Sequence, residues 1–138
     1  MYFDAENERY IEYTKLSNAQ TAVIVFYKFA DDFTTEYHTC FGIANKKKVL
    51  RQWINEEGYG DLEDTVTGKC GFEGLIWAYK KVEEFIELMS RPNTKRDCKL
   101  YVYGSDKRRH RIYKHFLKRL GFVEENNPYY GYILAKDL

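Results

Sequence analysis

The stretch "CKLYVYGSDKRRHRIYKHFLKRLGF" (Cys98–Phe122) decides the fold, because a strand pattern is followed directly by a helix pattern. Cys98–Gly104 is rich in aromatic and β-branched residues and predicts a strand. Ser105 or Asp106 then predicts the N-cap of a helix, and Gly121 predicts its end. Between these signals, apolar residues at helical spacing predict a buried stripe made of Ile112, Tyr113, Phe116, Leu117 and Leu120.

The sequence on either side of this stretch predicts one more helix and one more strand. In Leu75–Met89 the apolar residues recur three and four positions apart, which predicts an amphipathic helix. Its end is predicted before Pro92, because the residue before a proline avoids the helical conformation. Asn126–Pro128 predicts a turn, and Tyr129–Leu138 predicts a final strand.

The first third of the chain predicts three strands and a helix. The strands are expected at Tyr10–Leu16, Thr21–Phe29 and Tyr37–Ile43, and their short connections favour an antiparallel meander. Asn45 is the expected N-cap of a helix that stops at Gly58. The chain of 138 residues therefore predicts one α+β domain over residues 1–138, a mixed, mainly antiparallel sheet flanked by helices.

Composition indicates a globular protein, with 44% hydrophobic and 17% aromatic residues. No apolar run approaches the length of about 18 residues that spans a membrane, and the acidic N-terminus lacks the regions of a signal peptide. We therefore expect a cytoplasmic protein with no membrane partner. Cys40, Cys70 and Cys98 have no paired spacing and predict free thiols. His38 and Cys40 would share one strand face, but two ligands do not make a zinc site, so no metal site is expected.

Charge is distributed unevenly although the formal net charge is only +1. From Lys95 to Gly121 there are ten lysines and arginines against two aspartates, whereas the rest of the chain has twelve basic and nineteen acidic residues. This local basic region favours an anionic partner. The basic helix 106–120 is open to three interpretations: a solvated surface, a set of phosphate contacts for nucleic acid, or the wall of an anionic cofactor site.

Three glycines precede the helix that is predicted from Leu75. Gly68, Gly71 and Gly74 form a GxxGxxG pattern, in a loop that can direct backbone N–H groups toward a phosphate. Lys69 favours this anion site. The alternative is a tight turn that needs only the conformational freedom of glycine. Cys70 lies in the same loop, where a small residue explains its presence better than a nucleophile does.

The glycine loop, the following helix and strand, and "DKRRHRIYKHFLKRLGF" with its "RLGF" ending together resemble the GNAT superfamily of N-acetyltransferases. The resemblance covers residues 67–138, about half of the chain, and also suggests a phage origin. It implies a GNAT-like acyltransferase fold that uses acetyl-CoA to acetylate an amine of a protein or small molecule. It assigns cofactor binding to Gly68, Lys69, Cys70, Gly71, Gly74, Arg108 and Arg109.

Where the family carries a general-acid tyrosine this chain has Leu117, so Tyr113, one turn earlier, is the nearby substitute, and packing in the core is its alternative role. The reaction that the resemblance implies also needs a base to deprotonate the amine. The candidates are Glu36, Glu63 and Asp64, or a water held by them, and Glu36 is the one taken as the catalytic candidate. The alternative left open is a non-catalytic protein of the same fold that binds a protein or nucleic-acid partner, in particular through helix 106–120.

Overall fold

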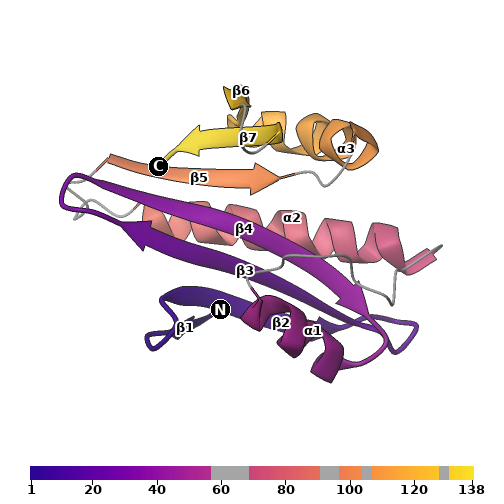
Figure 1. Ribbon diagram of the computed structural model, residues 1–138. Coiled ribbons are helices and arrows are strands. Elements are labelled where there is room, and N and C mark those ends of the chain that lie inside the picture. Colours follow the sequence, from indigo (N-terminus) through magenta and orange to yellow (C-terminus); the bar gives the residue numbers. More distant parts are fainter. Residues whose placement is uncertain (57–68, 91–96, 104–106, 128–130) are drawn as a thin grey trace. The chain divides into compact units, whose positions relative to one another are not determined.

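A computed structural model describes residues 1–56, 69–90, 97–103, 107–127 and 131–138, with the backbone alone at 69–71, 126, 127 and 132 (Figure 1). The elements, in chain order, are β1 (Tyr2–Asp4), β2 (Arg9–Lys15), β3 (Thr21–Ala30), β4 (Thr34–Ala44), α1 (Lys47–Asn55), α2 (Lys69–Met89), β5 (Asp97–Tyr103), α3 (Lys107–Leu117), the short 3₁₀ helix η1 (Lys118–Leu120), β6 (Val123–Asn127) and β7 (Gly131–Asp137).

The seven strands form one mixed sheet in the order β1-β2-β3-β4-β5-β7-β6. β4 and β5 are parallel, whereas β1 with β2, β2 with β3, β5 with β7 and β6 with β7 are antiparallel. The predicted α+β class, with a mixed and mainly antiparallel sheet and helices, is therefore confirmed. A parallel pair needs a long connection, and α1 and α2 lie in the connection between β4 and β5.

The chain divides into two compact units. The first unit is Met1–Tyr27 with Cys40–Lys81, and the second unit is Lys28–Thr39 with Val82–Leu138. β3, β4 and α2 each contribute residues to both units.

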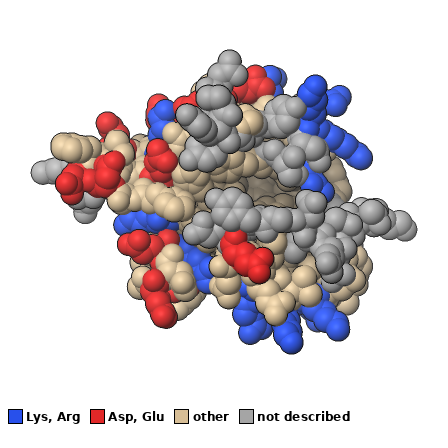
Figure 2. Space-filling view, in the orientation of Figure 1, with Lys and Arg blue, Asp and Glu red and all other residues tan. Residues whose placement is uncertain are grey.

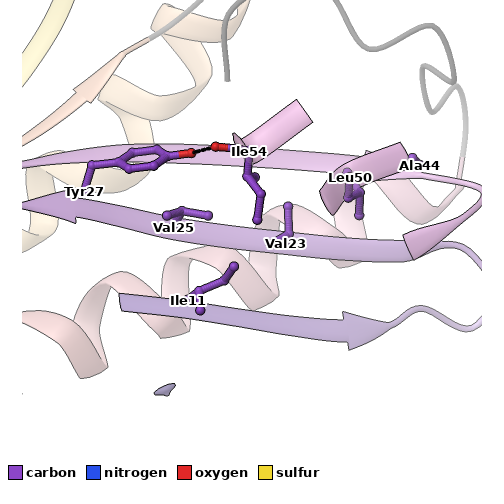
Figure 3. Packing of buried hydrophobic residues seen from close by; sticks show 7 residues of the cluster. All are labelled: Ile11, Val23, Val25, Tyr27, Ala44, Leu50 and Ile54. Carbon is purple, nitrogen blue, oxygen red and sulfur yellow. Dashed lines mark hydrogen bonds between the residues drawn. The ribbon is translucent and has the colours of Figure 1, made fainter. Parts of the chain in front are cut away.

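The core of the first unit forms between β2, β3, the end of β4 and α1 (Figure 3). α1 carries an apolar stripe, because Leu50 and Ile54 are buried while Val49 and Trp53 pack against the cluster. The hydroxyl of Tyr27 donates a hydrogen bond to the carbonyl of Ile54 at 2.6 Å, which satisfies a buried polar group near the end of the helix. The cluster consists of Ile11, Val23, Val25, Tyr27, Ala44, Leu50 and Ile54.

The core of the second unit forms where α2 packs on β4 and where α3 packs on β7. The rings of Tyr37 and Phe85 meet edge to face with centroids 4.9 Å apart, and both side chains are buried. Leu117 is the buried residue of α3, and the other four residues of its predicted stripe are half-buried. Gly121 ends the helical segment in the left-handed conformation, φ 90°, as predicted for a terminating glycine.

Five predicted details were wrong. Asn45 does not cap α1: its Oδ1 accepts a hydrogen bond from Gln20 Nε2 at 2.8 Å, and the N-cap position is Lys46. β1 was missed. β6 was missed too: Asn126 and Asn127, expected in a turn, pair with β7, because cross-strand pairing outweighs the weak strand preference of asparagine. α2 begins six residues before Leu75, at Lys69. α1 ends at Asn55 with Glu56 as its C-cap, so the helix stops before the predicted Gly58. Gly58 itself and the predicted caps Ser105 and Asp106 lie outside the described residues.

Candidate functional site

The parallel pair β4 and β5 brings four polar side chains together in the second unit. Its register pairs Glu36 with Lys99 and His38 with Tyr101. Because alternate residues of a strand point to the same side, these four side chains share one face of the sheet. Tyr103, two residues beyond Tyr101, lies on that face as well.

His38 lies between two hydrogen-bonding partners. Its Nε2 atom lies 3.0 Å from Oε2 of Glu36, and its Nδ1 atom is hydrogen-bonded to the hydroxyl of Tyr103. A carboxylate can only accept, so Nε2 carries a proton and donates it to Glu36. In the neutral imidazole Nδ1 is then the acceptor, and the Tyr103 hydroxyl donates to it. The three side chains therefore form a series of hydroxyl, imidazole and carboxylate, which we call the His38 relay.

Aromatic rings hold the imidazole in place. The ring of Tyr103 is stacked on it at an interplanar angle of 18°, and the ring of Tyr101 lies 5.1 Å from it between centroids. Phe29 meets it edge to face at 4.9 Å and is itself 49% exposed. The side chain of His38 is 19% exposed, and that of Glu36 is 45% exposed. The imidazole is thus restrained by its neighbours while the relay stays accessible from solvent.

The His38 relay has the arrangement used for proton transfer. A base is effective when a hydroxyl or thiol lies within hydrogen-bond reach and a third group orients the base. Here Tyr103 is the hydroxyl, His38 the base and Glu36 the orienting carboxylate. A proton taken up at Nδ1 creates an imidazolium whose charge the Glu36 carboxylate stabilises.

A surface depression adjoins the relay, with Glu36 and Tyr101 in its wall. Nζ of Lys99, which also lies in that wall, donates a hydrogen bond to Oε1 of Glu125 at 2.9 Å, and this bond raises the pKa of the ammonium. Burial, and then the charges of Glu125 and Glu36, raise the pKa of the Tyr101 hydroxyl, which therefore stays protonated at neutral pH. The depression is lined by Thr34, Thr35, Glu36, Asp97, Cys98, Lys99, Tyr101, Asp137 and Leu138.

The predicted cofactor residues around the glycines occupy the beginning of α2. Gly68 lies outside the described residues. Lys69, Cys70 and Gly71 form the first turn of the helix, where backbone N–H groups lack partners within the helix. Gly74 does not lie in a loop as expected: it is buried inside α2, where a Cβ atom would approach Cδ1 of Ile43 to 2.5 Å. Its physical role is to allow close packing of α2 on β4.

Glu73, one residue before Gly74, fixes the start of α2 to the connection between β2 and β3. Its carboxylate accepts hydrogen bonds from the backbone N–H of Ser17 at 3.1 Å and from the Ser17 hydroxyl at 2.6 Å. This carboxylate therefore serves the packing of the first unit.

The remaining predicted site residues lie in the second unit. Arg108 and Arg109 are exposed in the first turn of α3, and Tyr113 is half-buried in the middle of that helix. Their proposed roles stay predictions. Of the three candidate bases, Glu36 is joined to a second titratable side chain, His38, while Glu63 and Asp64 lie outside the described residues.

The thiols whose side chains are described lack the setting of a nucleophile. Burial raises the pKa of the Cys40 thiol to about 12, and burial also raises the pKa of the Cys98 thiol. Groups of three or more His, Cys, Asp or Glu side chains placed to hold a metal ion do not occur in the described part of the chain. Among the described helices, none combines the length and apolar character needed to cross a membrane.

The sequence patterns did not identify His38, Tyr101 and Tyr103 as site residues. The available signal was the Glu-x-His spacing of Glu36 and His38, which places both on one face of a strand. Their partner Tyr103 is 65 residues away from His38 in sequence, so nothing local connects the two.

No match to this chain was found among protein-family models, curated proteins or solved structures.

Proposed function

We propose that this protein transfers an acetyl group from acetyl-CoA to an amine, and that the His38 relay carries the proton of the reaction. The observation that supports this most strongly is the placement of His38 between the Glu36 carboxylate and the Tyr103 hydroxyl. The proposed reaction needs one group that first removes a proton and later returns it, which a restrained histidine can do.

The proton steps balance within the relay. As the amine nitrogen attacks the acetyl carbon, Oη of Tyr103 accepts the amine proton and passes its own proton to Nδ1 of His38. Glu36, hydrogen-bonded to Nε2, stabilises the imidazolium while the proton resides there. When the carbon–sulfur bond breaks, Nδ1 returns the proton through Tyr103 to the leaving sulfur. The relay ends in its starting state, because Oη of Tyr103 and Nδ1 of His38 each take up one proton and later release one.

Within the unit that contains the relay, Arg108 and Arg109 could hold the phosphates of the acyl donor, because their exposed guanidinium groups suit phosphate oxygens. Gly74 belongs to the other unit, where it packs on Ile43. The donor supplies the thioester, and the chain supplies position and proton transfer.

A second candidate is a non-catalytic protein that binds a partner through the same fold. Leu117 favours it, because this buried side chain stands where the resemblance implies a tyrosine that donates a proton. In this candidate the His38 relay would be a structural feature of the sheet, and its substitution would alter stability alone.

The test combines a binding measurement with a turnover measurement. Acetyl-CoA is titrated into the protein by calorimetry, and release of free CoA thiol is followed with a panel of amines that includes a diamine, an aromatic amine and a lysine peptide. We expect saturable binding and turnover with at least one amine. His38→Gln and Tyr103→Phe should each reduce turnover about 10²- to 10⁴-fold with binding unchanged. Tyr2→Phe, which removes an exposed hydroxyl, is the matched control.

Three results would contradict the proposal. Absence of acetyl-CoA binding by the folded protein would remove the acyl donor. Binding without turnover by any amine would support the non-catalytic candidate. Turnover that persists in His38→Gln would leave an acetyltransferase that does not use the relay.

A further inference from the structure

The outer surface of α3 and η1 carries a concentration of positive charge, of which the proposed acyl transfer uses only Arg108 and Arg109. Residues 107–120 contain seven lysines and arginines and no aspartate or glutamate. All seven are exposed: Lys107, Arg108, Arg109, Arg111, Lys114, Lys118 and Arg119. In Figure 2, lysine and arginine side chains gather over α3 on the face that is drawn.

Four of these cations form one line along the helix. Lys107, Arg111, Lys114 and Lys118 follow one another at intervals of four, three and four residues, which places them on the same side. We call these four residues the cationic stripe. With a rise of about 1.5 Å per residue, the stripe is roughly 16 Å long. A nucleic-acid strand carries one phosphate per about 3.4 Å of axis, so the stripe matches about five phosphates in length.

The charges are costly within the protein itself. The first turn of α3 carries Lys107, Arg108 and Arg109 and no acidic residue, so its cations face the positive end of the helix dipole. Along the stripe, Lys114 pairs with the Glu124 carboxylate at 3.1 Å, where both side chains are about half exposed. A bound polyanion would offset the repulsion among the cations.

The apolar residues of α3 decide between classes of partner. They face inward, and none of the large apolar side chains exposed in the described residues belongs to α3 or η1. A helix that binds a membrane surface needs an apolar side to bury among the lipids. A protein interface depends on buried aromatic or apolar anchors at its centre. The stripe offers neither, whereas contacts to a nucleic-acid backbone need only cations.

We propose that the cationic stripe of Lys107, Arg111, Lys114 and Lys118 binds the phosphodiester backbone of a nucleic acid without reading its bases. This inference is independent of the acyl transfer proposed above. Binding is electrostatic, so each phosphate contact releases a bound counterion and makes the affinity depend on salt.

The test measures affinity against salt concentration by fluorescence anisotropy, with a labelled single-stranded oligonucleotide of mixed sequence. We expect the logarithm of the association constant to fall linearly with the logarithm of the salt concentration. The triple variant Lys107→Gln/Arg111→Gln/Lys118→Gln should lower the slope by about 2, or 0.7 per lost contact to a single strand. It should also bind at least about tenfold more weakly at low salt.

The matched control removes three exposed cations, one at the N-cap of α1 and two within it, as Lys46→Gln/Lys48→Gln/Arg51→Gln, and should retain the wild-type slope. A charge-conserving variant, Lys107→Arg/Lys118→Arg, should bind as the wild type does. The proposal is overturned if the wild type does not bind at low salt, or if both triple variants lose affinity equally. It is also overturned if anionic vesicles or an acidic peptide compete at lower concentration than the oligonucleotide.

Discussion

The contact between Gly74 and Ile43 depends on the absence of one carbon atom. In a helix interior, alanine is usually more stable than glycine by about 1 kcal/mol, so glycine here requires a specific reason. The structure provides it: a Cβ atom at this position would meet Cδ1 of Ile43 at 2.5 Å and Cζ of Phe41 at 3.4 Å. From the GxxGxxG spacing, Gly74 was predicted to belong to a phosphate-binding loop. Its packing role depends instead on Phe41 and Ile43 of β4, which this spacing cannot reveal.

Gly74→Ala should therefore lower the free energy of unfolding by about 1 kcal/mol, because overpacking costs about 1–3 kcal/mol while the helix preference of alanine offsets about 1 kcal/mol of this cost. Chemical denaturation of the purified variant measures this. The double variant Gly74→Ala/Ile43→Val removes the atom that the new methyl group meets, and should recover part of the loss relative to Ile43→Val alone. If Gly74→Ala is as stable as the wild type or more stable, the close contact with Ile43 does not limit this site.

At the level of elements, strongly periodic segments were predictable and weakly patterned ones were not. α1, the apolar part of α2, α3, β2 and β3 have clear patterns and were found close to their predicted places. β6, with the sequence "VEENN", has no such pattern, and its pairing with β7 is reinforced by contacts of its glutamates. Glu124 contacts His110 at 2.8 Å and Lys114 at 3.1 Å, and these hydrogen bonds lower the pKa of its carboxyl. Such contacts come from other elements, so a local pattern cannot reveal them.

The start of α2 provides an element-scale prediction. Ser17 donates two hydrogen bonds to Glu73, and these hold the first turns of the helix against the β2–β3 connection. Ser17→Ala removes the shorter of the two bonds. Because the pair is exposed, the loss of global stability should be small, about 0.5–1 kcal/mol. Amide hydrogen exchange should accelerate in residues 72–76 at the start of α2, and stay unchanged in α3.

The amide exchange rates of α3 serve as the internal control for that measurement, because they should not change in Ser17→Ala. Equal acceleration in both helices would mean that the contact stabilises the whole fold, and unchanged exchange at the start of α2 would mean that the contact does not hold the helix.

At the scale of the whole molecule, the fold class followed from the sequence but the candidate site did not. The succession of strand and helix patterns was sufficient for a mixed α+β sheet, since element types limit how the sheet is built. The site depends on the register between β4 and β5, which places His38 opposite Tyr101 and within reach of Tyr103. One-residue shifts of register reverse the face of every side chain, and no local sequence signal specifies a register between strands so far apart.

The stability of the whole molecule in acid depends in part on the Glu12 carboxylate. Burial alone would raise the pKa of the Glu12 carboxyl, but hydrogen bonds from Lys81 and the N-terminal ammonium outweigh burial and lower it below 4.5. A lowered pKa in the folded state contributes stability above the unfolded value, and this stability is lost as the pH falls through the folded value. Glu12→Gln should be about 1–2 kcal/mol less stable at neutral pH, with the difference disappearing in acid.

Denaturant unfolding at a series of pH values measures this difference, and Glu6→Gln, at an exposed carboxylate, controls for the loss of one negative charge. A stability difference that is the same at neutral and acidic pH would mean that Glu12 acts through packing and not through its charge.

The proposed route of the proton requires that His38 accepts a hydrogen bond from Tyr103 at Nδ1 and donates one to Glu36 at Nε2. The most direct measurement is the tautomer of His38 by long-range ¹H–¹⁵N NMR on the full chain at a pH where the ring is neutral. We expect a protonated Nε2 and an unprotonated Nδ1 whose ¹⁵N shift changes in Tyr103→Phe. A protonated Nδ1, or a shift that is the same in Tyr103→Phe, would contradict the relay and with it the proposed route of the proton.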